Sequence, residues 1–190
     1  MTDTAEIDKA IEALRNGEVV AIPTDTVFGL AALVDNAEAV SKVFELKSRP
    51  ESIVLPVLVA DIDQARLVVE TNEIFQKLAN EFWPGALTLI AKRAEGFSAQ
   101  LGGDLSTVGV RSADHFAVRR ICSVLGPIVT TSANKHGSEP CTTIDEVREV
   151  FGEEVFVVDA LSGGQSPSTV VSVTDGTLEV LRDGPVTIEM

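Results

Sequence analysis

The chain has 190 residues, and its 29 acidic and 15 basic side chains give it a formal net charge of -14. Because 45% of the residues are hydrophobic, the composition excludes an intrinsically disordered chain and predicts one packed domain over residues 1–190. A strongly acidic protein repels the phosphates of nucleic acids, so any polyanionic ligand must meet a local basic pocket.

The sequence contains no signal for secretion or for membrane insertion. The first ten residues carry acids where a signal peptide carries bases. The longest apolar stretch, around residues 52–60, is interrupted by Pro56 and is far shorter than the roughly 20 residues that span a bilayer. The two cysteines and two histidines have no zinc-binding spacing. We therefore expect a soluble, cytoplasmic protein that does not associate with membranes.

The first half of the chain alternates between helical and strand patterns. Apolar spacing and stop signals predict helices over residues 7–14 and 37–47 and a third helix that starts at the N-cap residue Asn72. They also predict strands over residues 18–22 and 52–59. Because Pro56 cannot donate a hydrogen bond to a neighbouring strand, we expect the second of these strands at an edge of the sheet.

The second half continues this alternation and ends in a hairpin. The patterns predict strands over residues 86–92, 107–111 and 127–134, a helix capped by Asp114, and a helix opened by the capping box of Thr143 and Glu146. Two β-rich segments then flank Asp175-Gly176, the strongest short-range hairpin signal. The alternation predicts an α/β fold with a mixed sheet.

One pair of bases stands out in the acidic chain. Lys47 and Arg49 precede Pro50, which favours an extended backbone before it, and side chains two residues apart in an extended chain point the same way. Lys47 and Arg49 could therefore bind one anion. Alternatively, bases at a helix C-terminus only stabilise the helix dipole, by a few tenths of a kcal/mol to about 1 kcal/mol.

Three further segments place polar side chains at predicted strand ends, where open α/β sheets usually bind ligands. Thr24 and Thr26 lie on either side of Asp25. Their hydroxyls could face a cleft, or the three residues could form a simple turn. Thr107 and Arg111 share one face of a strand, where the arginine could hold a carboxylate or form only a surface ion pair.

The third segment runs from a strand into Ser132-Ala133-Asn134, which suits either hydrogen-bonding recognition or an Asn-initiated turn. Ser132 lacks a nucleophile elbow and a well-placed histidine base, so a nucleophilic serine is not expected. Neither GxxxxGK[ST] nor GxGxxG occurs in the sequence. Basic side chains would therefore have to hold the phosphates of any bound nucleotide.

Six motifs in order, "PTDTVFGL", "ELKSRP", "FWPGALTLI", "STVGVRSADH", "TTSANKHGSEPCT" and "STVVSV...LEVLRDG", resemble the YrdC-like (TsaC) threonylcarbamoyl-AMP synthase family over nearly the whole chain. The resemblance implies a twisted open mixed sheet around a large concave cavity. It also implies that L-threonine, bicarbonate or CO2, and ATP with Mg2+ give threonylcarbamoyl-AMP and diphosphate. A separate tRNA threonylcarbamoyl transferase complex would use the product to modify tRNAs that read ANN codons.

The resemblance also assigns site residues. It implies ATP binding by Lys47, Arg49, Thr107, Asn134, Thr142 and Arg182, with the three bases at the phosphates. It implies threonine binding by Thr26, Arg111, Ser132 and Ser168, with Arg111 at the carboxylate. No covalent catalyst is expected, since phosphoryl chemistry depends mostly on positioning and charge stabilisation.

Three positions depart from the family pattern. Ile53 stands where relatives often carry asparagine, Leu58 where some carry histidine, and Phe28 where many carry tyrosine. The change at Ile53 leaves open a relative that cleaves or only binds threonylcarbamoyl-AMP. A second alternative is a non-catalytic RNA-binding protein, which the negative charge and the 5% aromatic content disfavour. Weak direct binding of tRNA also stays open.

Overall fold

The computed structural model describes residues 4–103, 106–164 and 166–188. Over these residues the chain forms a nine-stranded mixed sheet in the order β7-β1-β2-β6-β3-β5-β4-β8-β9. The strands are β1 (Val20–Ile22), β2 (Gly29–Leu33), β3 (Val57–Leu58), β4 (Leu87–Lys92), β5 (Thr107–Arg111), β6 (Ile128–Ser132), β7 (Phe156–Val157), β8 (Thr169–Ser172) and β9 (Glu179–Arg182). The predicted α/β class and mixed sheet are confirmed.

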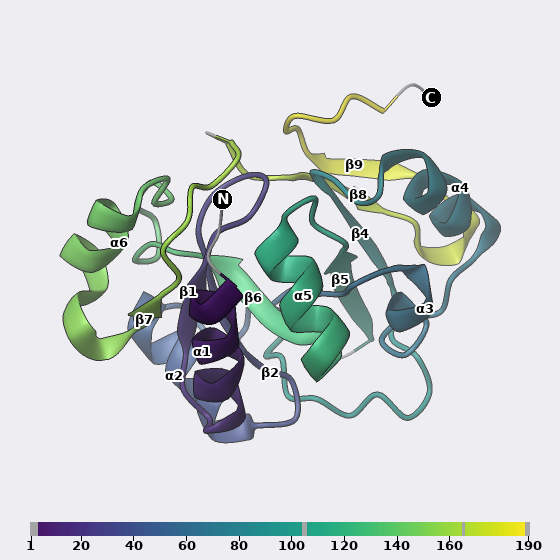
Figure 1. Cartoon of the computed structure of the whole chain (residues 1–190). Helices are drawn as coiled ribbons and strands as arrows, with labels where there is room; N and C mark the ends of the chain where they lie inside the picture. Colours follow the sequence, from purple (N-terminus) through teal and green to yellow (C-terminus); the bar gives the residue numbers. More distant parts are fainter. Residues whose placement is uncertain (1–3, 104–105, 165, 189–190) are drawn as a thin grey trace.

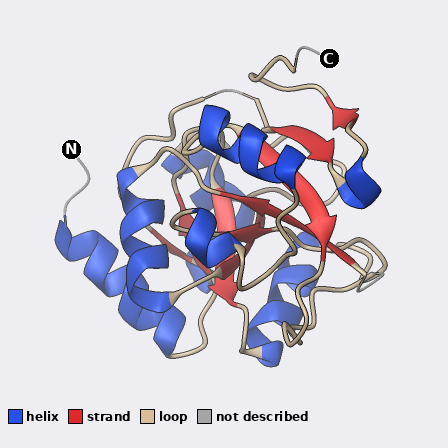
Figure 2. Ribbon diagram, turned by 90° about the vertical axis from the view of Figure 1, so that its right-hand side faces the viewer, coloured by secondary structure: helices blue, strands red, loops and turns tan. Residues whose placement is uncertain are grey.

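Helices pack around the sheet, and Figure 2 shows the strands running between them. The helices are α1 (Thr4–Arg15), α2 (Ala37–Lys47), α3 (Ile62–Ala65), α4 (Glu73–Phe82), α5 (Phe116–Leu125) and α6 (Ile144–Phe151), with 3-10 turns η1 (Gly152–Glu154) and η2 (Thr174–Gly176). None of the helices within these described ranges has the length and apolar character needed to cross a bilayer.

Two apolar clusters hold the helices to the sheet. One cluster joins α1 and α5, which lie side by side in Figure 1, and the other joins α2, α4 and α6. The alternation of a strand divides its side chains between the clusters: in and next to β1, Val20 and Ile22 belong to the first cluster and Val19 and Ala21 to the second. Buried apolar surface on both faces therefore fixes the sheet between its helices.

Two of the three predicted helix caps are confirmed, and Asn36 is a further cap. Asn36 and Asn72 accept hydrogen bonds from the first turns of α2 and α4, and Thr143 and Glu146 form the predicted capping box of α6. The expected cap of α5 at Asp114 is wrong. Asp114 pairs instead with Arg119 at 2.7 Å, and the next residue is the N-cap.

The predicted edge strand over residues 52–59 is also wrong. β3 covers only Val57 and Leu58 and lies inside the sheet, parallel to β5 and antiparallel to β6. The carbonyls of Ile53 and Val54 accept hydrogen bonds from the Arg49 side chain, and Pro56 has no N–H group to donate. Regular strand pairing can therefore begin only after the proline.

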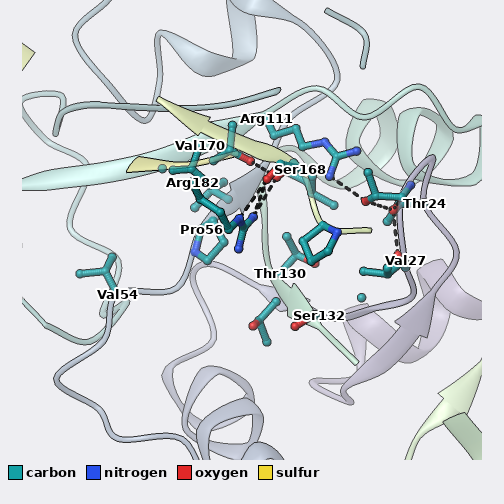
Figure 3. Close-up of a pocket in the computed structure, with 18 of the residues that line it drawn as sticks. Thr24, Val27, Val54, Pro56, Arg111, Thr130, Ser132, Ser168, Val170 and Arg182 are labelled. Atoms are coloured by element: carbon teal, nitrogen blue, oxygen red, sulfur yellow. Dashed lines mark hydrogen bonds between the residues drawn. The ribbon is translucent and has the colours of Figure 1, made fainter. Parts of the chain in front are cut away.

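The terminal hairpin is confirmed. β8 and β9 pair antiparallel, with a register shift at Val170/Val171. The connecting turn holds Asp175 at φ 56° and Gly176 at φ 74°, the left-handed region in which Asp-Gly turns are favoured. The hairpin pairs with β4 through β8, and Figure 3 shows that Arg182 of β9 lies beside Ser168.

Candidate active site

A cavity of about 450 Å3 opens on the sheet where β2, β5, β6, β8 and β9 come together. It is lined by seven of the ten predicted site residues: Thr26, Arg49, Thr107, Arg111, Ser132, Ser168 and Arg182. Figure 3 shows Arg111, Ser168 and Arg182 on one side of this space and Thr130 and Ser132 on the other. Segments far apart in the sequence thus build one polar cavity in an acidic protein.

Arg111, the last residue of β5, is the most constrained base in the cavity. Its Nη2 donates to Asp25 Oδ1 at 2.5 Å, its Nη1 to Thr26 Oγ1 at 2.9 Å, and its Nε to the Gly85 carbonyl at 2.9 Å. Burial lowers the pKa of Arg111, and the charge of Asp25 opposes this shift. An ion pair at the protein surface is excluded, because the Arg111 side chain is only 9% exposed.

The loop between β1 and β2 presents hydroxyl groups beside Arg111. Thr24 Oγ1 lies 2.9 Å from Thr26 Oγ1 and donates to the Val27 carbonyl at 2.8 Å. Both threonines are buried and line the cavity. The guanidinium of Arg111 and these two hydroxyls are suited to a small ligand that carries a carboxylate and a hydroxyl group.

Arg182 approaches the same space from β9. Its Nε and Nη2 donate to the Ser168 carbonyl at 3.0 and 2.7 Å, and the hydroxyls of Ser168 and Thr88 lie 2.8 Å apart. Burial, and then the like charge of Arg111, lower the pKa of Arg182. Two arginines held close enough to interact in this way favour an anionic ligand between them.

Arg49 lies after the end of α2 and lines the cavity beside an apolar wall. Its Nη2 donates to the Val54 carbonyl at 3.1 Å, and burial lowers its pKa. The wall near it includes Ile53, Val54 and Pro56. The change at Ile53 thus alters a side chain of the cavity wall and leaves the backbone contact to Arg49 in place.

Lys47 is placed differently from the expectation that it shares an extended face with Arg49. It ends helix α2, Ser48 adopts a left-handed conformation (φ 52°), and Lys47 is 1% exposed. Its Nζ donates to the carbonyls of Ser132 and Asn134 at 2.6 and 2.9 Å and to Asn134 Oδ1 at 2.8 Å. Burial, and then Arg49, lower its pKa to about 8.

Lys47 and Asn134 therefore brace the turn after β6, and neither is among the residues found to line the cavity. Thr142 also lies outside this lining; its backbone N–H and its hydroxyl donate to Glu146 Oε2 at 2.6 and 3.2 Å. The nucleotide-binding roles of these three residues stay predictions.

Sequence reasoning missed two polar residues of the site. The sequence pattern indicates only a turn at Asp25, although its carboxylate holds Arg111, and it gives no role to Thr88 of β4. A threonine inside the buried apolar strand "LTLIAK" was the available signal for Thr88. The departures Phe28 and Leu58 are both buried and line the cavity, so they make its surface more apolar.

The described residues hold no group of three or more histidine, cysteine, aspartate or glutamate side chains that could bind a metal ion. Divalent magnesium usually keeps several waters and binds through substrate phosphates and one or two carboxylates. A magnesium ion bound in that way would depend on the phosphates of a nucleotide for most of its ligands.

The fold and the cavity define an α/β protein with an arginine-lined cavity on a mixed sheet. Residues 12–184 match the Sua5_yciO_yrdC family model, described as "Telomere recombination", so the chain belongs to the Sua5/YciO/YrdC family. It is 33% identical over 183 residues to the threonylcarbamoyl-AMP synthase of Vibrio campbellii, covering 93% of this chain and 98% of that protein.

Two further comparisons agree with this membership. The chain is 37% identical over 193 residues to the threonylcarbamoyl-AMP synthase of Bacillus subtilis, covering 99% of this chain and 56% of that protein. It superposes on P. abyssi Sua5 complexed with L-threonine with a TM-score of 0.87 and 32% identity, covering 93% of this chain and 53% of the other. E. coli YciO shares the fold, with a TM-score of 0.87 at 23% identity over 96% and 91% of the two chains.

Proposed function

We propose that this protein is a threonylcarbamoyl-AMP synthase, which converts L-threonine, bicarbonate or CO2, and ATP with its Mg2+ into threonylcarbamoyl-AMP and diphosphate. The single observation that carries the proposal is the convergence of Arg49, Arg111 and Arg182 on one cavity in a chain of net charge -14. Relatives that carry this activity as their name, and cover the chain almost end to end, support it.

The threonine carboxylate would bind Arg111, and the threonine hydroxyl would bind the hydroxyls of Thr24 and Thr26. Arg111 is suited to this role because Asp25, Thr26 and Gly85 fix its guanidinium before the ligand arrives. A preorganised fork loses little side-chain entropy on binding. The L-threonine complex of P. abyssi Sua5 supports a threonine site in this fold.

The ATP phosphates would bind Arg49 and Arg182, while the apolar wall near Pro56 would contact the base. Each charge-assisted hydrogen bond contributes about 1.5 to 3 kcal/mol. Two arginines, with the metal ion on the phosphates, therefore offset the repulsion that the acidic surface exerts on a triphosphate. The predicted roles of Lys47, Thr107, Asn134 and Thr142 belong to this half of the proposal.

In the reaction, the threonine amine would form a bond to the carbon of CO2 and release a proton. A carbamate oxygen would then attack the α-phosphate, and the bond to the bridging oxygen would break, so that diphosphate leaves. This makes the protein a nucleotidyltransferase. Positioning alone can supply roughly 7 to 11 kcal/mol of such a barrier. Because a carbamate decomposes readily in water, the cavity would have to close over it.

The product would pass to the tRNA threonylcarbamoyl transferase complex, with at most weak direct contact between this protein and tRNA. The experiment that tests the proposal measures diphosphate release from ATP and Mg2+ by the purified protein, with threonine or bicarbonate omitted in turn. We expect release only when both are present. Release that needs neither, or no release from folded protein that binds ATP, would overturn the proposal.

A further inference from the structure

His115 connects helix α5 to a short segment that lies directly on residues 24–26, in the loop between β1 and β2. It is the N-cap of α5, where its Nδ1 accepts a hydrogen bond from the Ala117 N–H at 3.2 Å. Its Nε2 lies 3.2 Å from the carbonyl oxygen of Leu161. Because Nδ1 accepts, the proton of a neutral ring must sit on Nε2, which can then donate to Leu161.

Leu161 begins a segment, Leu161–Gly164, that we call the strap. The Gly163 N–H donates to the Thr24 carbonyl at 2.7 Å and the Gly164 N–H to the Thr26 carbonyl at 2.9 Å. Both glycines approach closely, since a Cβ on Gly163 would lie 3.0 Å from the Asp25 Cα and one on Gly164 2.9 Å from the Asp25 carbonyl oxygen. The strap thus fixes the backbone that carries both threonine hydroxyls and the partner of Arg111.

The strap is also tied to the far side of the site. Ser162 Oγ donates to the Thr142 carbonyl at 2.8 Å, which joins the strap to the segment before α6. At Leu161, whose side chain is 86% exposed, apolar packing does not anchor the strap. The contact with His115 therefore holds the end of the strap that packing leaves free.

We propose that His115 is a positioning residue for threonine: in its neutral Nε2–H form it holds the strap on residues 24–26 and so keeps Thr24, Thr26 and Asp25 in place around Arg111. This inference rests on the proposed function for its ligand, but the link between His115 and the strap is a property of the free protein. Protonation would place a hydrogen on Nδ1 opposite the Ala117 N–H and the positive end of α5, which the observed ring orientation cannot accommodate.

The surroundings of His115 favour the neutral ring. Burial is the largest influence and lowers the pKa of His115, while the Leu161 carbonyl and the charges of Asp25 and Asp114 oppose this shift and Arg119 adds to it. The neutral form therefore dominates above pH 6.5 and declines only as the pH falls further below that value. The contribution of His115 to threonine binding should follow the same window.

The variant that separates the two contacts is His115→Asn. Its side-chain oxygen can still cap α5, as asparagine does at other helix starts, but it is too short to reach Leu161. We expect a several-fold higher KM for threonine with little change in kcat, and wild-type affinity for ATP. His115→Gln, which can reach Leu161, should recover part of the loss. His136→Asn, at an exposed histidine, is the matched control.

A second variant tests the strap without touching His115. Gly163→Ala adds a Cβ against the backbone of Asp25 and should raise the threonine KM as well. Because both changes act through the position of the strap, the double variant should be little worse than Gly163→Ala alone. If the effects of the two changes on the threonine KM are fully additive in free energy, the two residues do not act together through the strap.

The deciding experiment combines amide hydrogen exchange of the free proteins with calorimetric threonine binding at pH 7.5 and at acid pH. We expect His115→Asn to speed exchange at Gly163 and Gly164, and the advantage of wild type in threonine affinity to shrink as the pH falls below 6.5. Unchanged exchange, or unchanged threonine affinity in a folded variant, would overturn the inference. If wild type makes no product, the proposed function fails, and the exchange result alone decides the role of His115.

Discussion

Lys47 and Asn134 are joined twice, because the Lys47 ammonium donates to the backbone carbonyl of Asn134 at 2.9 Å and to its side-chain oxygen at 2.8 Å. A third bond goes to the Ser132 carbonyl. Lys47→Ala would remove all three of these hydrogen bonds, although Asn134 Oδ1 would keep the bond from the Ser132 hydroxyl. We therefore expect the unfolding free energy to fall by about 1 to 3 kcal/mol. Urea unfolding measures this, and the exposed Lys42→Ala on the same helix is the control. Equal effects of the two changes would contradict the bracing role.

The charge of Lys47 gives a second, independent prediction. Burial lowers its pKa from 10.5 to about 8, so the ammonium becomes neutral above that pH in the folded protein while it stays charged in the unfolded chain. Stability should therefore rise between about pH 8 and 10.5. If the charge also serves the ATP phosphates, affinity for Mg2+-ATP should fall over the same range. Calorimetric titration measures this, and a flat affinity would remove Lys47 from the phosphate site.

Arg111→Lys keeps the positive charge but loses the planar fork that meets Asp25 and Thr26. The loss of one charge-assisted hydrogen bond to the threonine carboxylate corresponds to roughly a 10- to 100-fold higher KM for threonine. The KM for ATP should change far less. Arg66→Lys, in an exposed pair with Asp63, is the control. Equal increases in both KM values would contradict the assignment of Arg111 to threonine.

Arg182→Ala should weaken ATP binding by roughly 10-fold or more, because it removes a charge-assisted contact to the phosphates. Its fork rests on the Ser168 carbonyl, so its position in the cavity does not depend on the nucleotide. Binding measured without threonine isolates this effect, and Arg148→Ala on the exposed side of α6 serves for comparison. Wild-type affinity for ATP in Arg182→Ala would place the triphosphate elsewhere.

Sequence patterns predicted well those elements whose structure depends on residues close together in the chain. The helix over residues 37–47, the capping box at Thr143 and the Asp175-Gly176 turn all depend on neighbours within a few residues. β3 was placed at the wrong position in the sheet, because its central place is set by pairing with β5 and β6, which no local pattern records.

The candidate site was also predicted only in part. The motifs predicted which polar residues would gather, and seven of the ten line one cavity. Local reasoning could not show that Lys47 would meet Ser132, 85 residues away, or that Arg111 would meet Asp25, 86 residues away. Those contacts follow from the packing of α2 and β5 against other parts of the chain.

The most direct test of the account is whether label from 13C-bicarbonate enters an adduct that also contains threonine and AMP. The purified protein would be incubated with ATP, Mg2+, threonine and labelled bicarbonate, and the products would be identified by mass. We expect threonylcarbamoyl-AMP heavier by one mass unit, from its single labelled carbon, and we expect this product to be lost in Arg111→Ala. Folded wild-type protein that binds ATP and threonine but forms no labelled adduct would contradict it.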